Sequence, residues 1–192
     1  MADALSPTLI SACGGEVELR RAGHGPRLLV LHGEFGVPGA LEAHRLLARE
    51  FEVIIPSLPG YGASTRHDWI MGVHDLAAWV RWLARSLDLG GGLHVLGCSL
   101  GGWVAAELAA LAPEFFGRLV LAGPMGIKPD RGEIFDYFLE GPRTGLETAV
   151  AGAAQCAEFQ RFWGGEWSAE TADRAEQHRE MTCRIAWKPY MH

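Results

Sequence analysis

Residues 93–103 read Leu-His-Val-Leu-Gly-Cys-Ser-Leu-Gly-Gly-Trp and decide the fold of this chain. The apolar run that opens this stretch predicts a buried strand, and the helix formers after Ser99 predict a helix. Ser99 then stands on a sharp strand-to-helix turn, whose strained backbone leaves no space for side chains two residues before and after it. Gly97 and Gly101 occupy these two positions and meet the requirement.

The turn would direct the Ser99 hydroxyl outward at the N-terminus of the following helix. The partial positive charge of a helix N-terminus favours an oxyanion, and the N–H group of Leu100 would donate a hydrogen bond to it. The alternative is the glycine-rich turn of a nucleotide-binding domain, but G-x-G-x-x-G requires glycine where Ser99 stands. A P-loop lysine is also absent from this turn, so the pattern favours a nucleophilic serine.

The chain around this turn alternates predicted strands with predicted helices. Continuous apolar runs are typical of strands buried on both faces of a parallel sheet, and they occur at residues 28–31, 53–55, 93–96 and 119–122. Helical patterns separate these runs, including the stripe Leu76, Val80, Leu83 and Leu87. Residues 9–22 predict an edge hairpin. This order predicts an α/β fold with a doubly wound, mostly parallel sheet.

From about residue 126 the apolar residues fall at helical spacings only, beginning with Ile134, Phe135 and Phe138. The pattern predicts two parts, an α/β core at residues 1–125 and a helical region at residues 126–192. The helical region is rich in aromatic residues that could cover a pocket, namely Phe159, Phe162, Trp163, Trp167 and Trp187. Packing of the helices against one another is the simpler interpretation and is preferred for most of these rings.

The composition of the 192 residues excludes several classes of protein. The 17 Lys and Arg residues against 23 Asp and Glu give a net charge of −6, which argues against nucleic-acid or anionic-membrane partners. The apolar runs are far shorter than the roughly 20 residues of a membrane-spanning helix. The N-terminal residues lack the basic start of a secretory signal. We therefore expect a cytoplasmic protein with a small-molecule substrate.

The four cysteines are widely spaced and form no C-x-x-C pair, which predicts reduced thiols and neither a disulfide nor a zinc framework. They are Cys13, Cys98, Cys156 and Cys183. We expect no metal and no cofactor.

A second motif, His32-Gly33-Glu34-Phe35-Gly36, directly follows the first buried strand. Together with Pro-Ser-Leu-Pro-Gly-Tyr-Gly-Ala-Ser at 56–64 and the serine motif that begins at Gly97, it resembles the α/β-hydrolase fold superfamily. The closest resemblance is to esterase-like and meta-cleavage-product (carbon–carbon) hydrolase members. It covers about residues 9–125, and residues 126–192 resemble the start of their cap domain.

The resemblance implies a role for each matching residue. Ser99 would be the catalytic nucleophile, Gly97 and Gly101 the glycines of the nucleophile elbow, and the backbone N–H groups of Leu100 and Glu34 the oxyanion hole. Serine at the elbow disfavours the related haloalkane dehalogenases and epoxide hydrolases, because their chemistry requires a carboxylate nucleophile.

The chain departs from the superfamily after residue 125. In the superfamily the catalytic acid and histidine follow the nucleophile in the sequence, on loops after two further strands. Neither of these strands is recognised in the sequence of this chain. We therefore expect the N-terminal part of a longer hydrolase, with a sheet incomplete at its C-terminal side. His178 and His192 are the histidines after Ser99, His32 is the nearest alternative base, and Asp130 is the best remaining candidate for the acid.

Two functional hypotheses remain open. The first is a serine hydrolase that cleaves a small, apolar ester or a carbon–carbon bond beside a ketone, with little activity alone because the base is missing. The second is a non-catalytic α/β-hydrolase-like protein that binds a ligand or a partner. The incomplete sheet further predicts self-association through the exposed edge of the strand at 119–122.

Overall fold

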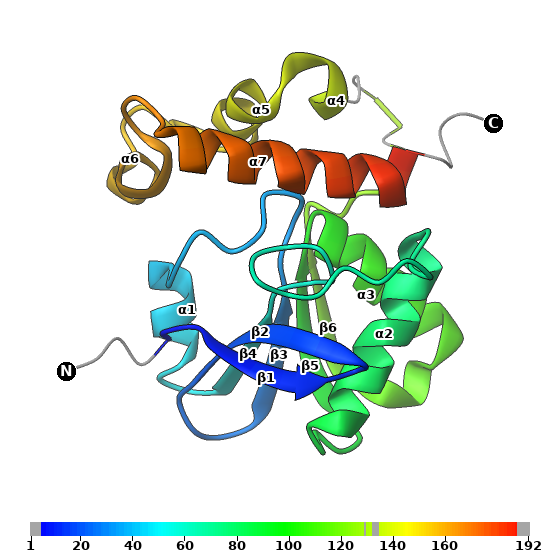
Figure 1. The fold of residues 1–192 in the computed structure, drawn as a ribbon. Coiled ribbons are helices and arrows are strands. Elements are labelled where there is room, and N and C mark those ends of the chain that lie inside the picture. Colours follow the sequence, from blue (N-terminus) through cyan, green and yellow to red (C-terminus); the bar gives the residue numbers. More distant parts are fainter. Residues whose placement is uncertain (1–4, 129, 132–134, 188–192) are drawn as a thin grey trace.

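The computed structural model describes residues 5–128, 130–131 and 135–187. In this part of the chain, six strands form one sheet in the order β1-β2-β4-β3-β5-β6 (Figure 1). The strands are β1 (Thr8–Ala12), β2 (Gly15–Ala22), β3 (Arg27–Leu31), β4 (Glu52–Pro56), β5 (Leu93–Cys98) and β6 (Phe116–Ala122). The last four run parallel, whereas β1 and β2 form an antiparallel hairpin beside β4. The predicted edge hairpin and the mostly parallel sheet are confirmed.

Helices cover both faces of this sheet because alternate residues of its central strands point to opposite sides. On β3, Leu29 and Leu31 belong to the apolar core under α2 (Val73–Ser86) and α3 (Leu100–Leu111). Leu28 and Val30 pack on the other face, in a cluster that includes Leu47 of α1 (Glu42–Leu47). The continuous apolar run of β3 therefore serves two cores, as the doubly wound prediction requires.

The predicted stripe on α2 faces the larger core. Leu76 and Val80 are fully buried and Leu83 nearly so, and Trp79 beside them is 1% exposed. Leu87 is half-buried and caps the end of the helix. The short 3-10 helix η1 (Pro113–Phe115) follows α3 and leads into β6.

Where the structure describes the chain after β6, its regular elements are all helices, as the sequence pattern predicts, and they lie together over the carboxyl ends of the parallel strands (Figure 1). They are α4 (Tyr137–Glu140), α5 (Pro142–Ala149), α6 (Ala157–Trp163), α7 (Ala169–Thr182) and the π-helical turn η2 (Cys183–Trp187). Ile134, which opened the predicted helical spacing, lies outside the described residues.

Strand β6 forms one edge of the sheet and differs from the central strands in burial. Val120 is 56% exposed and Leu121 is 36% exposed, although the sequence pattern is that of a strand buried on both faces. The reason is its position, because only β5 pairs with it among the residues that the structure describes.

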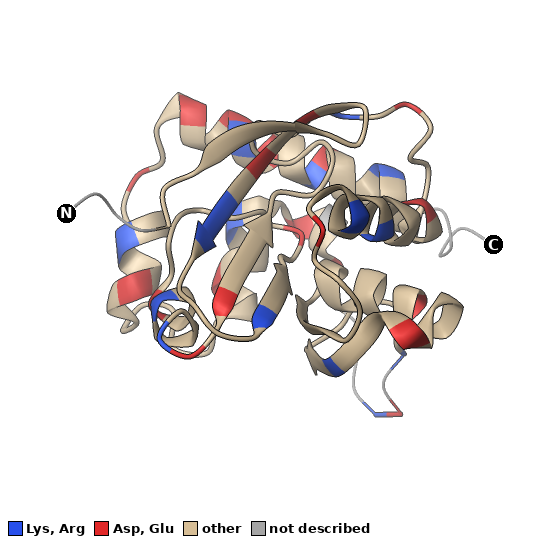
Figure 2. Ribbon diagram, turned by 90° about the horizontal axis from the view of Figure 1, so that it is seen from below, with Lys and Arg blue, Asp and Glu red and all other residues tan. Residues whose placement is uncertain are grey.

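Charged residues are interspersed over the described elements (Figure 2). Several of them form ion pairs at the surface, such as Arg21 with Glu52 and Arg143 with Glu147. Within the described ranges, none of the helices is both long and apolar enough to cross a membrane. The four cysteines are free thiols.

Candidate active site

Ser99 occupies the strained turn that the sequence predicts. It precedes α3 with φ 48° and ψ −114°, a backbone conformation that residues other than glycine rarely adopt. Three hydrogen bonds hold it there: Ser99 N–H donates to Ala122 O at 3.0 Å, and the N–H groups of Trp103 and Met125 donate to Ser99 O at 3.1 Å and 3.0 Å. The surrounding backbone thus fixes the strained residue, as is common at functional sites.

Contacts at the two flanking glycines explain why this turn excludes side chains. A Cβ atom at Gly97 would lie 2.6 Å from Gly101 O. A Cβ atom at Gly101 would lie 2.5 Å from His32 O and closer still to Leu31 O. Both positions therefore pack directly against backbone, which is the steric requirement behind the sequence prediction.

The loop that follows β3 passes beside Ser99. A Cβ atom at Gly33 would lie 3.1 Å from Ser99 Cβ, and the N–H of Gly36 donates to Gly33 O at 3.1 Å to close a tight turn that contains Glu34. Across the described part of the chain, the N–H groups of Glu34 and Leu100 donate to no other residue. Two unused donors therefore lie on the two segments that flank the serine.

His32 holds this loop in place and has no nitrogen left for proton transfer. Its Nδ1 donates to Gly33 O at 2.7 Å, and its Nε2 accepts a hydrogen bond from Leu58 N–H at 2.8 Å. Burial lowers the pKa of His32 to about 4, so the ring is neutral at pH 7. The structure thus gives His32 a positioning role and removes it as a substitute base.

His178 of α7 also contacts this loop. Its Nδ1 donates to Phe35 O at 3.0 Å, and its Nε2 accepts a hydrogen bond from Gly62 N–H at 3.3 Å. Burial lowers its pKa, so this ring is neutral too. Four residues further along α7, the Thr182 hydroxyl pairs with Tyr61 Oη at 2.7 Å. Sequence reasoning missed this docking of α7.

The remaining candidates for a base or an acid do not complete the site. Ser99 is half-buried, and its Oγ forms no hydrogen bond with any described residue. Asp130 is exposed to solvent. His192 lies outside the described residues. Within the described ranges, no group of three or more His, Cys, Asp or Glu side chains could hold a metal ion.

Residues 26–179 match the family model described as alpha/beta hydrolase fold. This chain belongs to that family. An uncharacterized protein of Mycobacterium tuberculosis is 34% identical over 117 residues, which are 60% of this α/β hydrolase chain and 34% of that protein. The pimeloyl-acyl-carrier-protein methyl ester esterase of Aeromonas hydrophila is 37% identical over 109 residues, covering 54% of this chain and 40% of the esterase. The chain thus spans well under half the length of these relatives.

Solved structures share the fold of this α/β hydrolase chain. A membrane phospholipase A, described as a bacterial virulence factor, superimposes with a TM-score of 0.71 at 24% identity, covering 97% of this chain and 66% of that protein. Esterase RhEst1 from Rhodococcus superimposes with a TM-score of 0.68 at 19% identity, covering 91% and 71%. At these identities the likeness concerns the fold alone.

The α/β hydrolase chain has a cavity of about 330 Å³ beside the serine turn. The loop after β3 contributes Glu34 and Phe35, and the segment after β6 contributes Met125, whose N–H bonds to Ser99 O. Residues of helices α4 and α5 also line it. The rest of the lining is mostly apolar or small: Pro124, Gly126, Ile127, Phe135, Tyr137, Gly145, Thr148 and Ala149.

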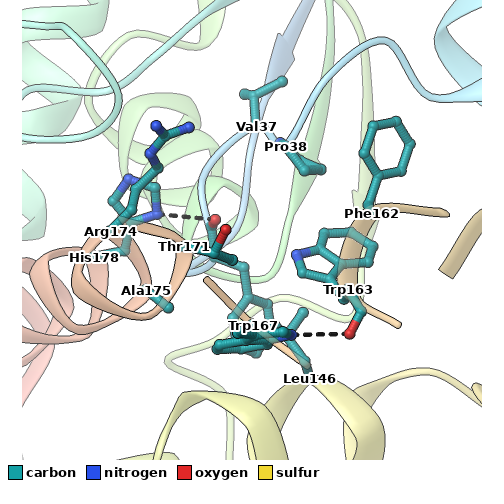
Figure 3. Close-up of a pocket in the computed structure, with 11 residues that line it drawn as sticks. Val37, Pro38, Leu146, Phe162, Trp163, Trp167, Thr171, Arg174, Ala175 and His178 are labelled. Carbon is teal, nitrogen blue, oxygen red and sulfur yellow. Dashed lines mark hydrogen bonds between the residues drawn. The ribbon is translucent and has the colours of Figure 1, made fainter. Parts of the chain in front are cut away.

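A second cavity of about 190 Å³ lies between the loop after β3 and helices α5 to α7 (Figure 3). Phe35 lines both cavities. Of the aromatic residues noted in the sequence, Phe162, Trp163 and Trp167 line this second cavity, whereas Phe159 is 4% exposed and packs between helices. Pocket lining and helix packing each account for part of the aromatic set.

Acidification is expected to destabilise the chain through His32. Its pKa of about 4 in the folded chain lies below the ordinary value of 6.5, so between these pH values the unfolded chain binds a proton that the folded chain does not. Stability is then complete above pH 6.5 and falls as the pH approaches 4, by about 3 kcal/mol for such a shift. The burial of His178 acts in the same direction.

Urea unfolding at pH 7.0 and pH 4.5 measures this loss, with His32→Gln as the comparison. The variant is expected to be less stable at pH 7.0 and to lose less stability on acidification. Equal losses in the two proteins would contradict the role of His32.

Proposed function

We propose that this chain supplies the nucleophile and the oxyanion hole of a serine hydrolase, with Ser99 as the nucleophile and the Leu100 and Glu34 N–H groups as the oxyanion hole. The observation that carries the proposal is the strained turn at Ser99, which puts a half-buried hydroxyl at the N-terminus of α3. The elbow role of Gly97 and Gly101 is supported by their close packing against backbone.

In the proposed reaction, Ser99 Oγ adds to the carbonyl carbon of the substrate and its proton passes to a general base. The carbonyl oxygen becomes an oxyanion, which the two N–H groups and the N-terminus of α3 stabilise. The intermediate then collapses, the leaving group departs with a proton, and water releases the acyl group from Ser99. The bond cleaved is an ester or, alternatively, a carbon–carbon bond beside a ketone.

The cavity beside the serine supports a small, apolar substrate, because Phe35, Met125 and Ile127 contribute to its lining. The similarity to a methyl ester esterase favours the ester over the carbon–carbon bond. We further propose that residues 1–125 form the catalytic core and residues 126–192 a cap that covers the cavity. Four free thiols support the cytoplasmic location expected from the sequence.

The proposal is tested with a fluorophosphonate probe, which forms a covalent adduct with activated serines. The chain is expected to take up one probe molecule slowly, since no described histidine bonds to Ser99 Oγ, and Ser99→Ala is expected to take up none. Intact-mass measurement follows the adduct, and peptide mapping locates it. Ser11→Ala is the matched control, because this exposed serine lies on β1, the opposite edge strand to β6. Equal labelling of wild type and Ser99→Ala would refute the assignment.

A non-catalytic ligand-binding protein is the second candidate. The lack of a hydrogen bond between Ser99 Oγ and any described base favours it. It predicts that the chain binds small apolar molecules and forms no adduct with the probe even after prolonged incubation. The same labelling experiment therefore separates the two candidates.

A further inference from the structure

The Glu34 side chain is a buried carboxylate that lacks a complete set of partners. The residue is 8% exposed, and its Oε2 atom is buried without a hydrogen bond from any described residue. A carboxylate loses its hydration on burial, so such groups are normally paired or hydrogen-bonded. The lack of a hydrogen-bond partner at Glu34 Oε2 therefore requires an explanation.

Glu18 of the same chain illustrates a satisfied carboxylate. Its Oε1 atom accepts hydrogen bonds from Arg20 Nη1 at 2.6 Å and from Ser57 Oγ at 3.1 Å. Its Oε2 atom accepts one from Ala63 N–H at 3.0 Å. Both carboxylate oxygens of Glu18 accept hydrogen bonds, and the Arg20 guanidinium lies beside them. Glu34 has neither a full set of hydrogen bonds nor a described cation partner.

The ionisable groups whose pKa the Glu34 charge shifts supply no positive charge. They are the phenols of Tyr61 and Tyr137 and the thiol of Cys98; burial is the main cause that raises the pKa of each, and the Glu34 charge raises it further. All three are neutral at pH 7. The protein around Glu34 therefore leaves its charge uncompensated as far as the structure describes it.

Glu34 is also the one charged residue in the described lining of the 330 Å³ cavity. Its neighbours in that lining include Phe35, Met125, Ile127 and Phe135. The cavity lining thus combines apolar residues with a single acidic residue, a combination that suits a ligand with an apolar body and one positive group. Such a ligand would supply the charge that the protein lacks.

We propose that the Glu34 carboxylate is a recognition group that binds an ammonium group on an otherwise apolar substrate. The inference rests on the proposed function, because it takes the cavity as the substrate site. A bound ammonium group would neutralise a carboxylate that otherwise repels the oxyanion held by the Glu34 and Leu100 N–H groups. The side chain and the backbone of one residue would then serve substrate choice and catalysis respectively.

Binding of two ligands of similar shape tests the proposal on the full chain. The probes are 2-phenylethylamine, which is an ammonium ion at pH 7, and 2-phenylethanol, its neutral analogue, followed by NMR titration. The wild type is expected to bind the amine at least tenfold more tightly. Glu34→Gln keeps the shape and the backbone N–H, and it is expected to lose this preference. Glu140→Gln, an exposed acidic position on α4, is the matched control and is expected to keep it.

Equal binding of amine and alcohol to the wild type would overturn the proposal, whatever the folding of the variants. Retention of the preference in Glu34→Gln would overturn it as well. Ser99→Ala separates this inference from the proposed function, since it is expected to keep the preference for the amine while losing the fluorophosphonate adduct. Failure of the adduct alone would refute the nucleophile, and failure of the preference alone would refute the ammonium site.

Discussion

Gly101→Ala is expected to destabilise the chain by about 3 kcal/mol, at the upper end of the usual cost of overpacking. In an ordinary helix the same change is stabilising by about 1 kcal/mol. Here the added Cβ would lie 2.5 Å from His32 O and closer still to Leu31 O. Neither carbonyl can rotate away as a side chain does, because both lie at the carboxyl end of β3.

Gly91→Ala is the matched control for this substitution. A Cβ atom at Gly91 would meet nothing within 4 Å, so its effect is expected to stay within about 0.5 kcal/mol. Urea unfolding of the two variants and the wild type measures the difference. A Gly101→Ala variant as stable as the wild type would mean that the turn does not pack against β3 as the structure describes.

The local features of the fold could be predicted from the sequence because their physical causes are local. An apolar run without alternation is enough to predict β3, since both faces of that strand are covered. The turn at Ser99 could be predicted from the spacing of Gly97 and Gly101 around the serine; the Gly97 contact lies within the turn itself, whereas the contact of Gly101 with the end of β3 joins distant residues and is known only from the structure. The roles of these residues in catalysis stay predictions.

The docking of α7 could not be predicted in this way, because its contacts join residues far apart in the chain. His178 bonds to Phe35 and Gly62, and Thr182 bonds to Tyr61. One signal was present in the sequence: His178, Met181 and Thr182 have the spacing of a single helix face. The structure shows that all three are buried. That spacing predicts which face of the helix is buried, but it does not predict which segment of the chain the face packs against.

Local sequence patterns also could not predict the burial of the Glu34 side chain or the exposure of side chains on β6. A glutamate after His-Gly carries no sign that its side chain turns inward. Residues 119–122 have the apolar pattern of a central strand, yet Val120 is 56% exposed because the strand lies at the edge of the sheet. Position within a sheet depends on pairing, which a run of apolar residues does not encode.

The exposed edge of β6 is expected to pair with a second copy of the chain. An edge strand presents unpaired N–H and C=O groups, and an apolar edge is a template for another strand. Strand β6 has seven residues and includes the exposed Val120 and Leu121. The other edge strand, β1, has five residues, and two of them are the polar Thr8 and Ser11, so β6 is the stronger template.

Val120→Lys is expected to weaken this association at least tenfold, because a lysine at an exposed edge opposes pairing with another strand. Leu9→Lys on β1 is the matched control, since Leu9 is 58% exposed and Val120 is 56% exposed. Sedimentation velocity over a hundredfold range of concentration would follow the association of the three proteins. A wild type that stays monomeric throughout would show that the edge is protected, and an equal effect of the two lysines would show that β6 has no special part in the association.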